Sequence, residues 1–242
     1  MVTRGRKQQG TERSIIVVAG EGHYDRQVVE HLLPALLPAP CPKVVHLKSD
    51  VTRLSKADKQ LTPRVDRLRQ LANAMAAGQE ARLIGVVIHV DFDAVADEKY
   101  RAARHRISGE LRRAFGPAVS SALALAASET EGWLALFPDA FTHHNRSWKL
   151  SPADCRRDWG TVEKAKEGLM RALKKPPYRE SHAPEIMREA VGHGLISKGP
   201  SGRNCSYTDF VDELETWRSS HPAAAPESMA GGRRNKPRMP KS

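Results

Sequence analysis

The sequence has few cysteines and no long apolar run. Its three cysteines, Cys41, Cys155 and Cys205, are far apart and form no CxxC pair, which argues against a disulfide framework and against a zinc knuckle. No apolar segment approaches the roughly 18 to 20 residues that a membrane-spanning helix needs. The basic N-terminus leads into a short strand and not into a signal-peptide core. We therefore expect a cytoplasmic protein with no membrane partner.

The chain has an excess of positive charge, with a net charge of +11 over 242 residues. Residues 1–13 carry a net charge of +3 and residues 219–242 a net charge of +4, so the two ends supply most of the excess. Basic ends of this composition are typical of disordered arms, which either bind polyanions without sequence preference or only aid solubility. Nucleic acid is therefore a candidate partner.

The hydrophobic pattern predicts an α/β fold. Four short apolar or small-residue runs, at 14–19, 44–47, 83–90 and 119–127, are typical of buried parallel strands. Helical periodicity separates them at 24–37, from Pro63 to Gly78, and at 94–115, and a short helix is expected at 129–137. Alternating strands and helices imply a parallel sheet. After residue 140 the strand signal fades, and helices are expected near 161–173, 185–191 and 207–218.

Acidic residues follow two of the predicted strands. Glu21 and Asp25 come just after the first strand, and glycines on both sides of Glu21 allow backbone and ligand to approach closely. Asp25 also suits the first turn of a helix, where acids are common. Functional groups in open α/β sheets sit beyond the carboxyl ends of the strands, and crowded carboxylates need a cation to neutralise them. These residues therefore predict part of a divalent metal site.

The strand at 83–90 ends in a second acidic pair. Asp91 and Asp93 form a DxD motif, and two positions apart in an extended chain both side chains point to one side. They can then share one cation, or span two metals about 4 Å apart in a phosphoryl-transfer site. A structural role in the loop after the strand is the alternative.

The segment Ser128-Glu129-Thr130-Glu131 follows the last predicted strand. Ser128 with Glu131 is the SxxE pattern of a capping box. A capped helix N-terminus also favours bound anions such as phosphate, so Ser128 is expected to serve as a helix cap, a phosphate contact or both. By itself this motif does not identify a function.

The order of these acidic motifs along the chain resembles that of a Toprim domain. The motifs are the Glu21-Gly22 element with Asp25, the Asp91/Asp93 pair and the Ser128/Glu131 pair. More narrowly, the chain resembles Toprim nucleases of the overcoming-lysogenization-defect type and small stand-alone Toprim-like proteins of bacterial defence islands. The resemblance covers roughly residues 14–137. It implies a Toprim-like catalytic domain at 14–137 with a parallel four-stranded sheet between helices, a helical C-terminal extension at 138–218, and disordered basic arms at 1–13 and 219–242.

The resemblance also implies a reaction and its ligands. The chain would be a nuclease that hydrolyses phosphodiester bonds with Mg²⁺ or Mn²⁺, most simply as a pair of ions, and it would serve antiviral defence. Glu21, Asp91 and Asp93 would hold metal, and Asp25 and Glu131 would complete a second metal site. A late lysine in the nuclease branch stabilises charge, and Lys198 is the candidate here. Many such nucleases carry or partner with an ATPase, so a separate ATPase subunit is an expected partner, and a homo-oligomer is a further possibility.

Nucleic-acid contacts are expected from the basic helix at 94–115, and DNA is expected in preference to RNA. The residues predicted to hold the phosphate backbone are Arg101, Arg104, Arg112 and Arg113. Primase and topoisomerase chemistry fit less well, because the chain is short and none of its tyrosines stands in a recognisable nucleophile motif. The alternative to an enzyme is a basic nucleic-acid-binding or regulatory subunit whose acidic residues hold a structural cation.

Overall fold

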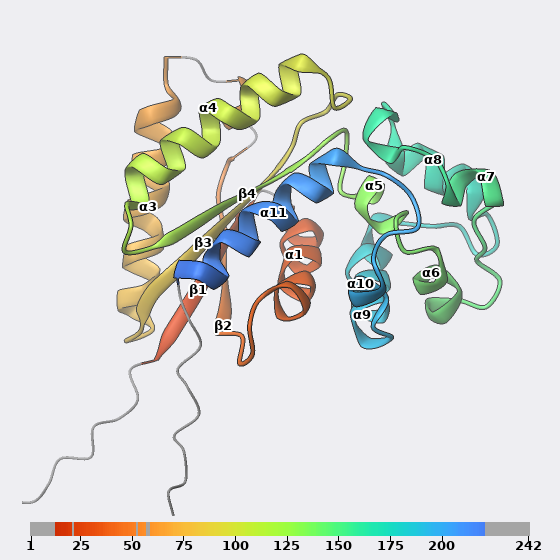
Figure 1. Cartoon of the computed structure of the whole chain (residues 1–242), viewed down its shortest axis with the longest axis horizontal. Coiled ribbons are helices and arrows are strands. Elements are labelled where there is room, and N and C mark those ends of the chain that lie inside the picture. The colour runs from red at the N-terminus through yellow and green to blue at the C-terminus, as the bar shows by residue number, and fades with distance from the viewer. Residues whose placement is uncertain (1–12, 21, 52, 57–58, 221–242) are drawn as a thin grey trace, which may run out of the picture.

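The protein is described by a computed structural model that covers residues 13–20, 22–51, 53–56 and 59–220, with only the backbone described for 218–220. Four strands form one sheet: β1 (Ser14–Gly20), β2 (Lys43–Lys48), β3 (Arg82–Asp91) and β4 (Ser120–Ala126). Their order is β2-β1-β3-β4, and all three pairings are parallel. The predicted α/β class with a four-stranded parallel sheet between helices is therefore confirmed (Figure 1). Because the strands are parallel, the carboxyl ends of β1, β3 and β4 lie side by side at one end of the sheet, which we call its carboxyl edge.

Helices cover both faces of the sheet because alternate strand residues point to opposite faces. Ile15, Val17 and Ala19 pack with the helices at 61–78 and 98–115 on one face. Ile16 and Val18 pack with the helix at 23–36 and with the C-terminal helices on the other face. The helices are α1 (His23–Leu36), α2 (Arg53–Lys56), α3 (Leu61–Gly78), α4 (Glu98–Phe115), α5 (Glu131–Leu134), α6 (Pro138–His144), α7 (Pro152–Cys155), α8 (Ala165–Ala172), α9 (Ala183–Gly192), α10 (Leu195–Lys198) and α11 (Cys205–Ser220), with 3₁₀ turns η1 (Trp159–Thr161) and η2 (Glu180–His182).

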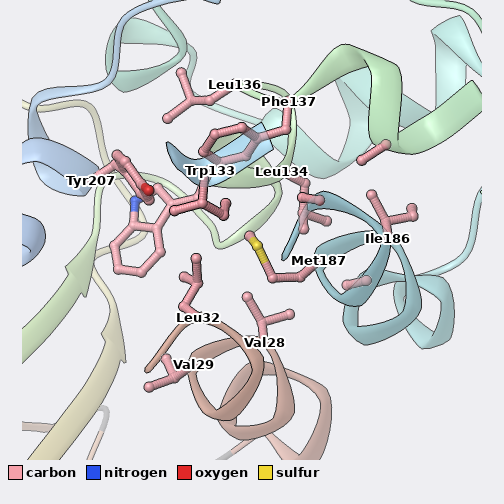
Figure 2. Packing of buried hydrophobic residues seen from close by; sticks show 14 of the residues in the cluster. Val28, Val29, Leu32, Trp133, Leu134, Leu136, Phe137, Ile186, Met187 and Tyr207 are labelled. Carbon is pink, nitrogen blue, oxygen red and sulfur yellow. The ribbon is translucent and has the colours of Figure 1, made fainter. Parts of the chain in front are cut away.

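The mostly helical C-terminal part shares its core with the first half of the chain. Val28 and Leu32 of α1 face Trp133 of α5 and Ile186 and Met187 of α9 (Figure 2). All five side chains are essentially buried. The segment that follows residue 137 therefore packs directly on the α1 face of the sheet, and its stability depends on the strands and helices before it.

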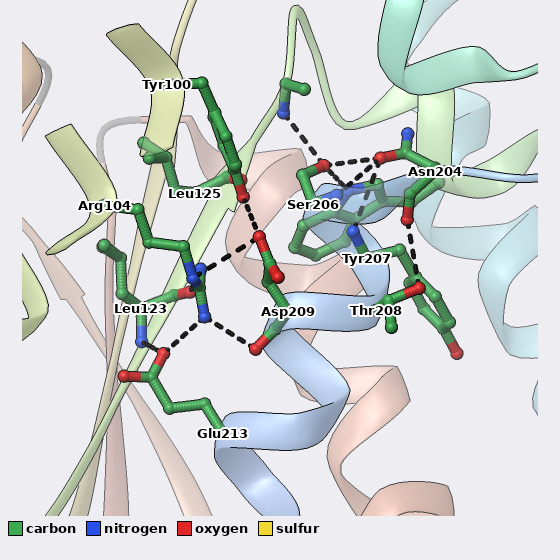
Figure 3. Close-up of polar contacts among 12 residues, drawn as sticks. Tyr100, Arg104, Leu123, Leu125, Asn204, Ser206, Tyr207, Thr208, Asp209 and Glu213 are labelled. Carbon is green, nitrogen blue, oxygen red and sulfur yellow. Dashed lines mark hydrogen bonds and ion pairs between the residues drawn. The ribbon is translucent and has the colours of Figure 1, made fainter. Parts of the chain in front are cut away.

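β4 is an edge strand of the sheet, and side chains from α4 and α11 hydrogen-bond to its free backbone edge (Figure 3). Glu213 accepts a hydrogen bond from the Leu123 amide at 3.0 Å, and Arg104 Nη1 donates to the Leu123 carbonyl at 2.9 Å. Arg104 also forms an ion pair with Glu213, with Nη2 2.8 Å from Oε2. Because an unpaired strand edge invites pairing with another chain, these contacts protect β4.

Two helices differ from the expected boundaries. The helix expected from residue 94 begins at Glu98, because the Asp97 side chain caps it by accepting from the Tyr100 amide. The Ala94 carbonyl accepts from the Ser128 amide and so belongs to the loop. The helix expected over 129–137 is the single turn α5, followed by a separate helix that begins at Pro138. Within the described residues, no helix combines the length and apolar character that crossing a membrane requires.

Candidate functional site

Three carboxylates from separate segments meet beyond the carboxyl ends of the strands. Asp25 lies in the first turn of α1, Asp91 ends β3, and Glu131 begins α5 after β4. Parallel pairing of β1 with β3 and of β3 with β4 brings these segments to the same edge. We call Asp25, Asp91 and Glu131 the carboxylate cluster. The structure thus brings together three of the residues that the sequence predicted as metal ligands.

A threonine hydroxyl connects two members of this cluster. Thr130 Oγ1 lies 2.8 Å from Asp25 Oδ1, 3.4 Å from Asp91 Oδ1 and 2.8 Å from His89 Nε2. His89 Nε2 is itself 3.7 Å from Asp91 Oδ1. Thr130 is 1% exposed and His89 2% exposed, so water has little access to these contacts. Both carboxylates therefore lie within hydrogen-bonding distance of one hydroxyl group.

The cluster is electrostatically unfavourable without a cation. Burial, followed by the charges of Asp25 and Glu131, raises the pKa of Asp91 well above its usual value. Burial also raises the pKa of Glu131 to about 7, where the nearby charge of Lys166 opposes the effect and Glu129 and Asp25 add to it. Carboxylates that raise one another's pKa are stabilised in the charged form by a positive ion.

Carboxylate oxygens are the donors that Mg²⁺ and Mn²⁺ prefer, so the cluster fits such an ion in chemistry and in charge. Gly22 adds a steric feature, because a Cβ at this position would lie 1.9 Å from Asp25 Oδ2. The absence of a side chain there leaves room for the carboxylate. Among the residues that the structure covers, however, no group of three or more His, Cys, Asp or Glu side chains is spaced to hold a metal ion, so the cluster matches such an ion in donor type and charge but not in the spacing of its carboxylates. Glu21, a predicted catalytic residue and metal ligand, lies outside the described residues.

Asp93 does not share the extended backbone on which its pairing with Asp91 was predicted. Its φ of 57° lies in the left-handed region, so the alternation of the strand ends at Asp91. The Asp93 carboxylate forms an ion pair with Lys56 of α2, with Oδ2 3.4 Å from Nζ, and its side chain is 60% exposed. Its charge still contributes to the raised pKa of Asp91. Asp93 thus lies near the cluster, but its carboxylate is paired with α2.

The expected capping box of Ser128 and Glu131 is not formed. The N-cap of α5 is Thr130, and Ser128 Oγ instead donates to the carbonyl of Glu163 at 2.6 Å. Ser128 is fully buried with a φ of 60°. It therefore ties the turn after β4 to the C-terminal part of the chain, and its hydroxyl proton is used in the hydrogen bond to the Glu163 carbonyl.

The C-terminal part contributes residues that the sequence did not single out. Tyr178 donates to Glu131 Oε1 at 3.2 Å, and the Lys166 amide donates to Glu129 Oε2 at 2.7 Å. Lys166 Nζ lies 3.9 Å from Glu129 Oε1 and 3.3 Å from Glu180 Oε2. The neighbouring acids, led by Glu131, raise the pKa of Lys166 despite its partial burial. Lys166 is thus a cation beside the carboxylate cluster.

Lys198, the lysine predicted to act in catalysis, is at the end of α10. Its side chain is exposed, and in the described part of the chain it makes no ion pair and no side-chain hydrogen bond. Helix α10 packs against α9. Lys166 therefore occupies the position beside the acids that was expected of Lys198.

The four predicted nucleic-acid-binding arginines have different environments. Arg104 is 14% exposed in its side chain and is engaged by Glu213 and by Asp209, so it is a structural residue and not the surface cation expected. Arg113 forms ion pairs with Asp66 and Glu110. Arg101 and Arg112 are exposed, and Arg112 only approaches Glu213, at 3.9 Å.

Some of the additional site residues left a signal in the sequence. His89 precedes Asp91 by two positions on one strand, and strand periodicity places both side chains on the same face. A polar residue at that place in an otherwise apolar strand could have been recognised. Lys166 and Tyr178 come from a segment with no motif, and only the packing of the C-terminal part brings them to the strand ends.

Comparisons of the chain with protein-family models, with curated proteins and with solved structures find no match. The Toprim resemblance therefore stays a prediction from the motifs. The basis for a functional proposal is the geometry at the strand ends, where Asp25 and Asp91 both contact Thr130 and Glu131 lies close enough to raise the pKa of Asp91.

Proposed function

We propose that this chain is a divalent-metal-dependent nuclease of the Toprim type that hydrolyses phosphodiester bonds, with DNA as the preferred substrate. The observation that carries the proposal is the convergence of Asp25, Asp91 and Glu131 from three separate segments at the carboxyl edge of a parallel sheet. Burial and neighbouring acids raise the pKa values of Asp91 and Glu131, and carboxylates perturbed in this way are typical of functional sites. The net charge of +11 favours a polyanionic substrate.

In this proposal the carboxylate cluster holds Mg²⁺ or Mn²⁺, together with the predicted ligands Glu21 and Asp93. A bound ion of this kind supplies an activated water and offsets the negative charge that develops on a phosphate. The chain's own residues hold the site in shape. Thr130 Oγ1 contacts both Asp25 and Asp91, and Tyr178 donates a hydrogen bond to one oxygen of Glu131.

Lys166 is the cation that the proposal assigns to the phosphate in place of Lys198. Its ammonium group lies within 4 Å of Glu129 and Glu180 and is close enough to Glu131 to shift the pKa of both groups. An ammonium beside the metal-binding acids can interact with a phosphate oxygen. The exposed Arg101 and Arg112 are the helix residues that remain available for the nucleic-acid backbone. A role in antiviral defence and a separate ATPase partner are extensions of the proposal that depend on the motif resemblance alone.

Plasmid nicking tests the proposal. Wild-type protein should convert supercoiled DNA to nicked or linear products with Mg²⁺ or Mn²⁺ and not with EDTA. Asp91→Asn should reduce the rate by at least about a hundredfold, because it removes a charged group from the reacting site. Glu215→Gln is the matched control, since Glu215 is an exposed acid on α11 without an ion pair in the described structure. Undiminished cleavage by Asp91→Asn would remove the assignment of catalysis to the carboxylate cluster, and a wild type that gives no metal-dependent products would remove the nuclease assignment.

A non-catalytic nucleic-acid-binding subunit is the second candidate. It is favoured by the absence, among the described residues, of a group of acids already spaced to hold an ion. Such a subunit should shift DNA in the presence of EDTA, lose affinity steeply with added salt, and leave the DNA intact when metal is supplied. Metal-dependent products from the wild type, lost in Asp91→Asn, would decide against it.

A further inference from the structure

His89 and Thr130 contact the carboxylate cluster, and the role that we assign to them there rests on the proposed function. Thr130 Oγ1 has three polar neighbours within 3.5 Å: Asp25 Oδ1, His89 Nε2 and Asp91 Oδ1. A hydroxyl group has one proton to donate and can accept hydrogen bonds in return. Thr130 can therefore donate to only one of the two carboxylates at a time.

The distances indicate how this single proton is used. The contact with Asp25 at 2.8 Å is shorter than that with Asp91 at 3.4 Å, so Asp25 is the main acceptor. Since the hydroxyl proton is donated to Asp25, the 2.8 Å contact between His89 Nε2 and Thr130 Oγ1 is a hydrogen bond in which the imidazole N–H donates to the hydroxyl oxygen. In this arrangement the Asp91 carboxylate keeps oxygen lone pairs that accept no close hydrogen bond from the described residues, which suits it to bind a cation.

The surroundings hold this network in place. His89 lies on the central strand β3, and its ring packs edge-on against Trp133 with centroids 6.3 Å apart. Trp133 is fixed by a 2.8 Å hydrogen bond from its indole nitrogen to Ser206 of α11. The imidazole therefore has little freedom to rotate, and Thr130 stands between a rigid strand and the first turn of α1.

We infer that Thr130, supported by His89, is a positioning residue that sets the spacing of Asp25 and Asp91 and leaves Asp91 available to a divalent cation. Groups that hydrogen-bond to ligating carboxylates orient them, and removing one typically weakens metal binding about 10-fold to 100-fold. The role belongs to the hydroxyl group and not to the methyl group of the threonine.

The experiment measures the affinity of the purified full-length protein for Mn²⁺ alone, from the electron paramagnetic resonance signal of free Mn²⁺. Thr130→Val, which keeps the shape and removes the hydroxyl, should weaken Mn²⁺ binding about 10-fold to 100-fold. Thr130→Ser, which keeps the hydroxyl, should stay within about threefold of the wild type, a difference well below the effect of losing an orienting group. Thr130→Ala repeats the test if the valine disturbs folding.

Thr142→Val is the matched control, because Thr142 Oγ1 also donates one hydrogen bond, to the Trp148 carbonyl at 3.0 Å, but away from the carboxylate cluster. Its Mn²⁺ affinity should equal that of the wild type. Equal affinity of Thr130→Val and wild type would overturn the positioning role while leaving the nuclease proposal in place, as would a serine variant as weak as the valine variant. Failure of the wild type itself to bind Mn²⁺ would instead remove the proposed metal site, and the positioning role with it.

Discussion

The raised pKa of Glu131 makes a specific prediction about stability. In the folded protein the pKa of Glu131 is raised to about 7, against 4.5 for an unperturbed glutamate, chiefly because the side chain is buried. Each pH unit between the two values corresponds to about 1.4 kcal/mol. Charging Glu131 in the folded protein therefore costs about 3 kcal/mol above pH 7, and Glu131→Gln removes this cost.

The direction with pH follows from the number of bound protons. Between pH 4.5 and about 7 the folded state holds a proton on Glu131 that the unfolded state has released, so the free energy of unfolding of the wild type falls as pH rises. Well below pH 4.5 Glu131 is protonated in both the folded and the unfolded state, so the cost is absent. Glu131→Gln should thus match the wild type at low pH and become more stable than it by about 3 kcal/mol at pH 8.

Urea unfolding in EDTA at several pH values measures this difference. The pKa of Asp91 is raised as well, but Asp91 is present in both the wild type and Glu131→Gln. The difference in the free energy of unfolding between these two proteins therefore reports on Glu131 and on its coupling to Asp91. Glu215→Gln should follow the wild type at every pH. A difference in the free energy of unfolding between Glu131→Gln and wild type that stays constant with pH, or that grows toward low pH, would refute the assignment of Glu131 to a buried position among other charged groups.

Three further predictions concern the metal and the fold. Mn²⁺ at a hundredfold excess over its dissociation constant should stabilise the wild type by about 2.7 kcal/mol in urea unfolding, and Asp91→Asn should lose most of this gain. Gly85→Ala should destabilise the protein by about 1 to 3 kcal/mol, because the new Cβ would lie 2.6 Å from the Trp217 ring; a change below about 0.5 kcal/mol would contradict that packing. Arg104→Met should cost about 2 to 3 kcal/mol by removing the 2.8 Å ion pair with Glu213, and the double mutant Arg104→Met/Glu213→Gln should recover part of this loss, which a double-mutant cycle measures.

The fold class followed from the sequence because strand and helix periodicities are local. The strand at 83–90 and the helix after it were recognised from a few consecutive residues each, and the structure bears them out as β3 and α4. Boundaries that depend on distant contacts were less accurate. Residues 94–97 are drawn into a loop by contacts with Ser128 and Gly160, which a local pattern does not contain.

The candidate site was predictable in part. Parallel strands end at a common edge, so Asp25, Asp91 and Glu131 could be assigned to one place from their positions after strands. The conformation of each residue after the strand was not predictable in the same way. Asp93 turns into a left-handed conformation toward Lys56, and Ser128 turns inward toward Glu163, because the loops adapt to their packing partners.

By itself, the sequence determined the parallel sheet and the arrival of acidic residues at its carboxyl edge, since both follow from short-range periodicity and chain direction. Tertiary structure alone decided which cation stands beside those acids, which hydroxyl connects them and which arginine serves the fold. Lys166 and Arg104 gain their roles from partners 37 and 109 residues away in the chain. Such contacts depend on how the helices pack on the sheet, and no local pattern of residue types encodes that packing.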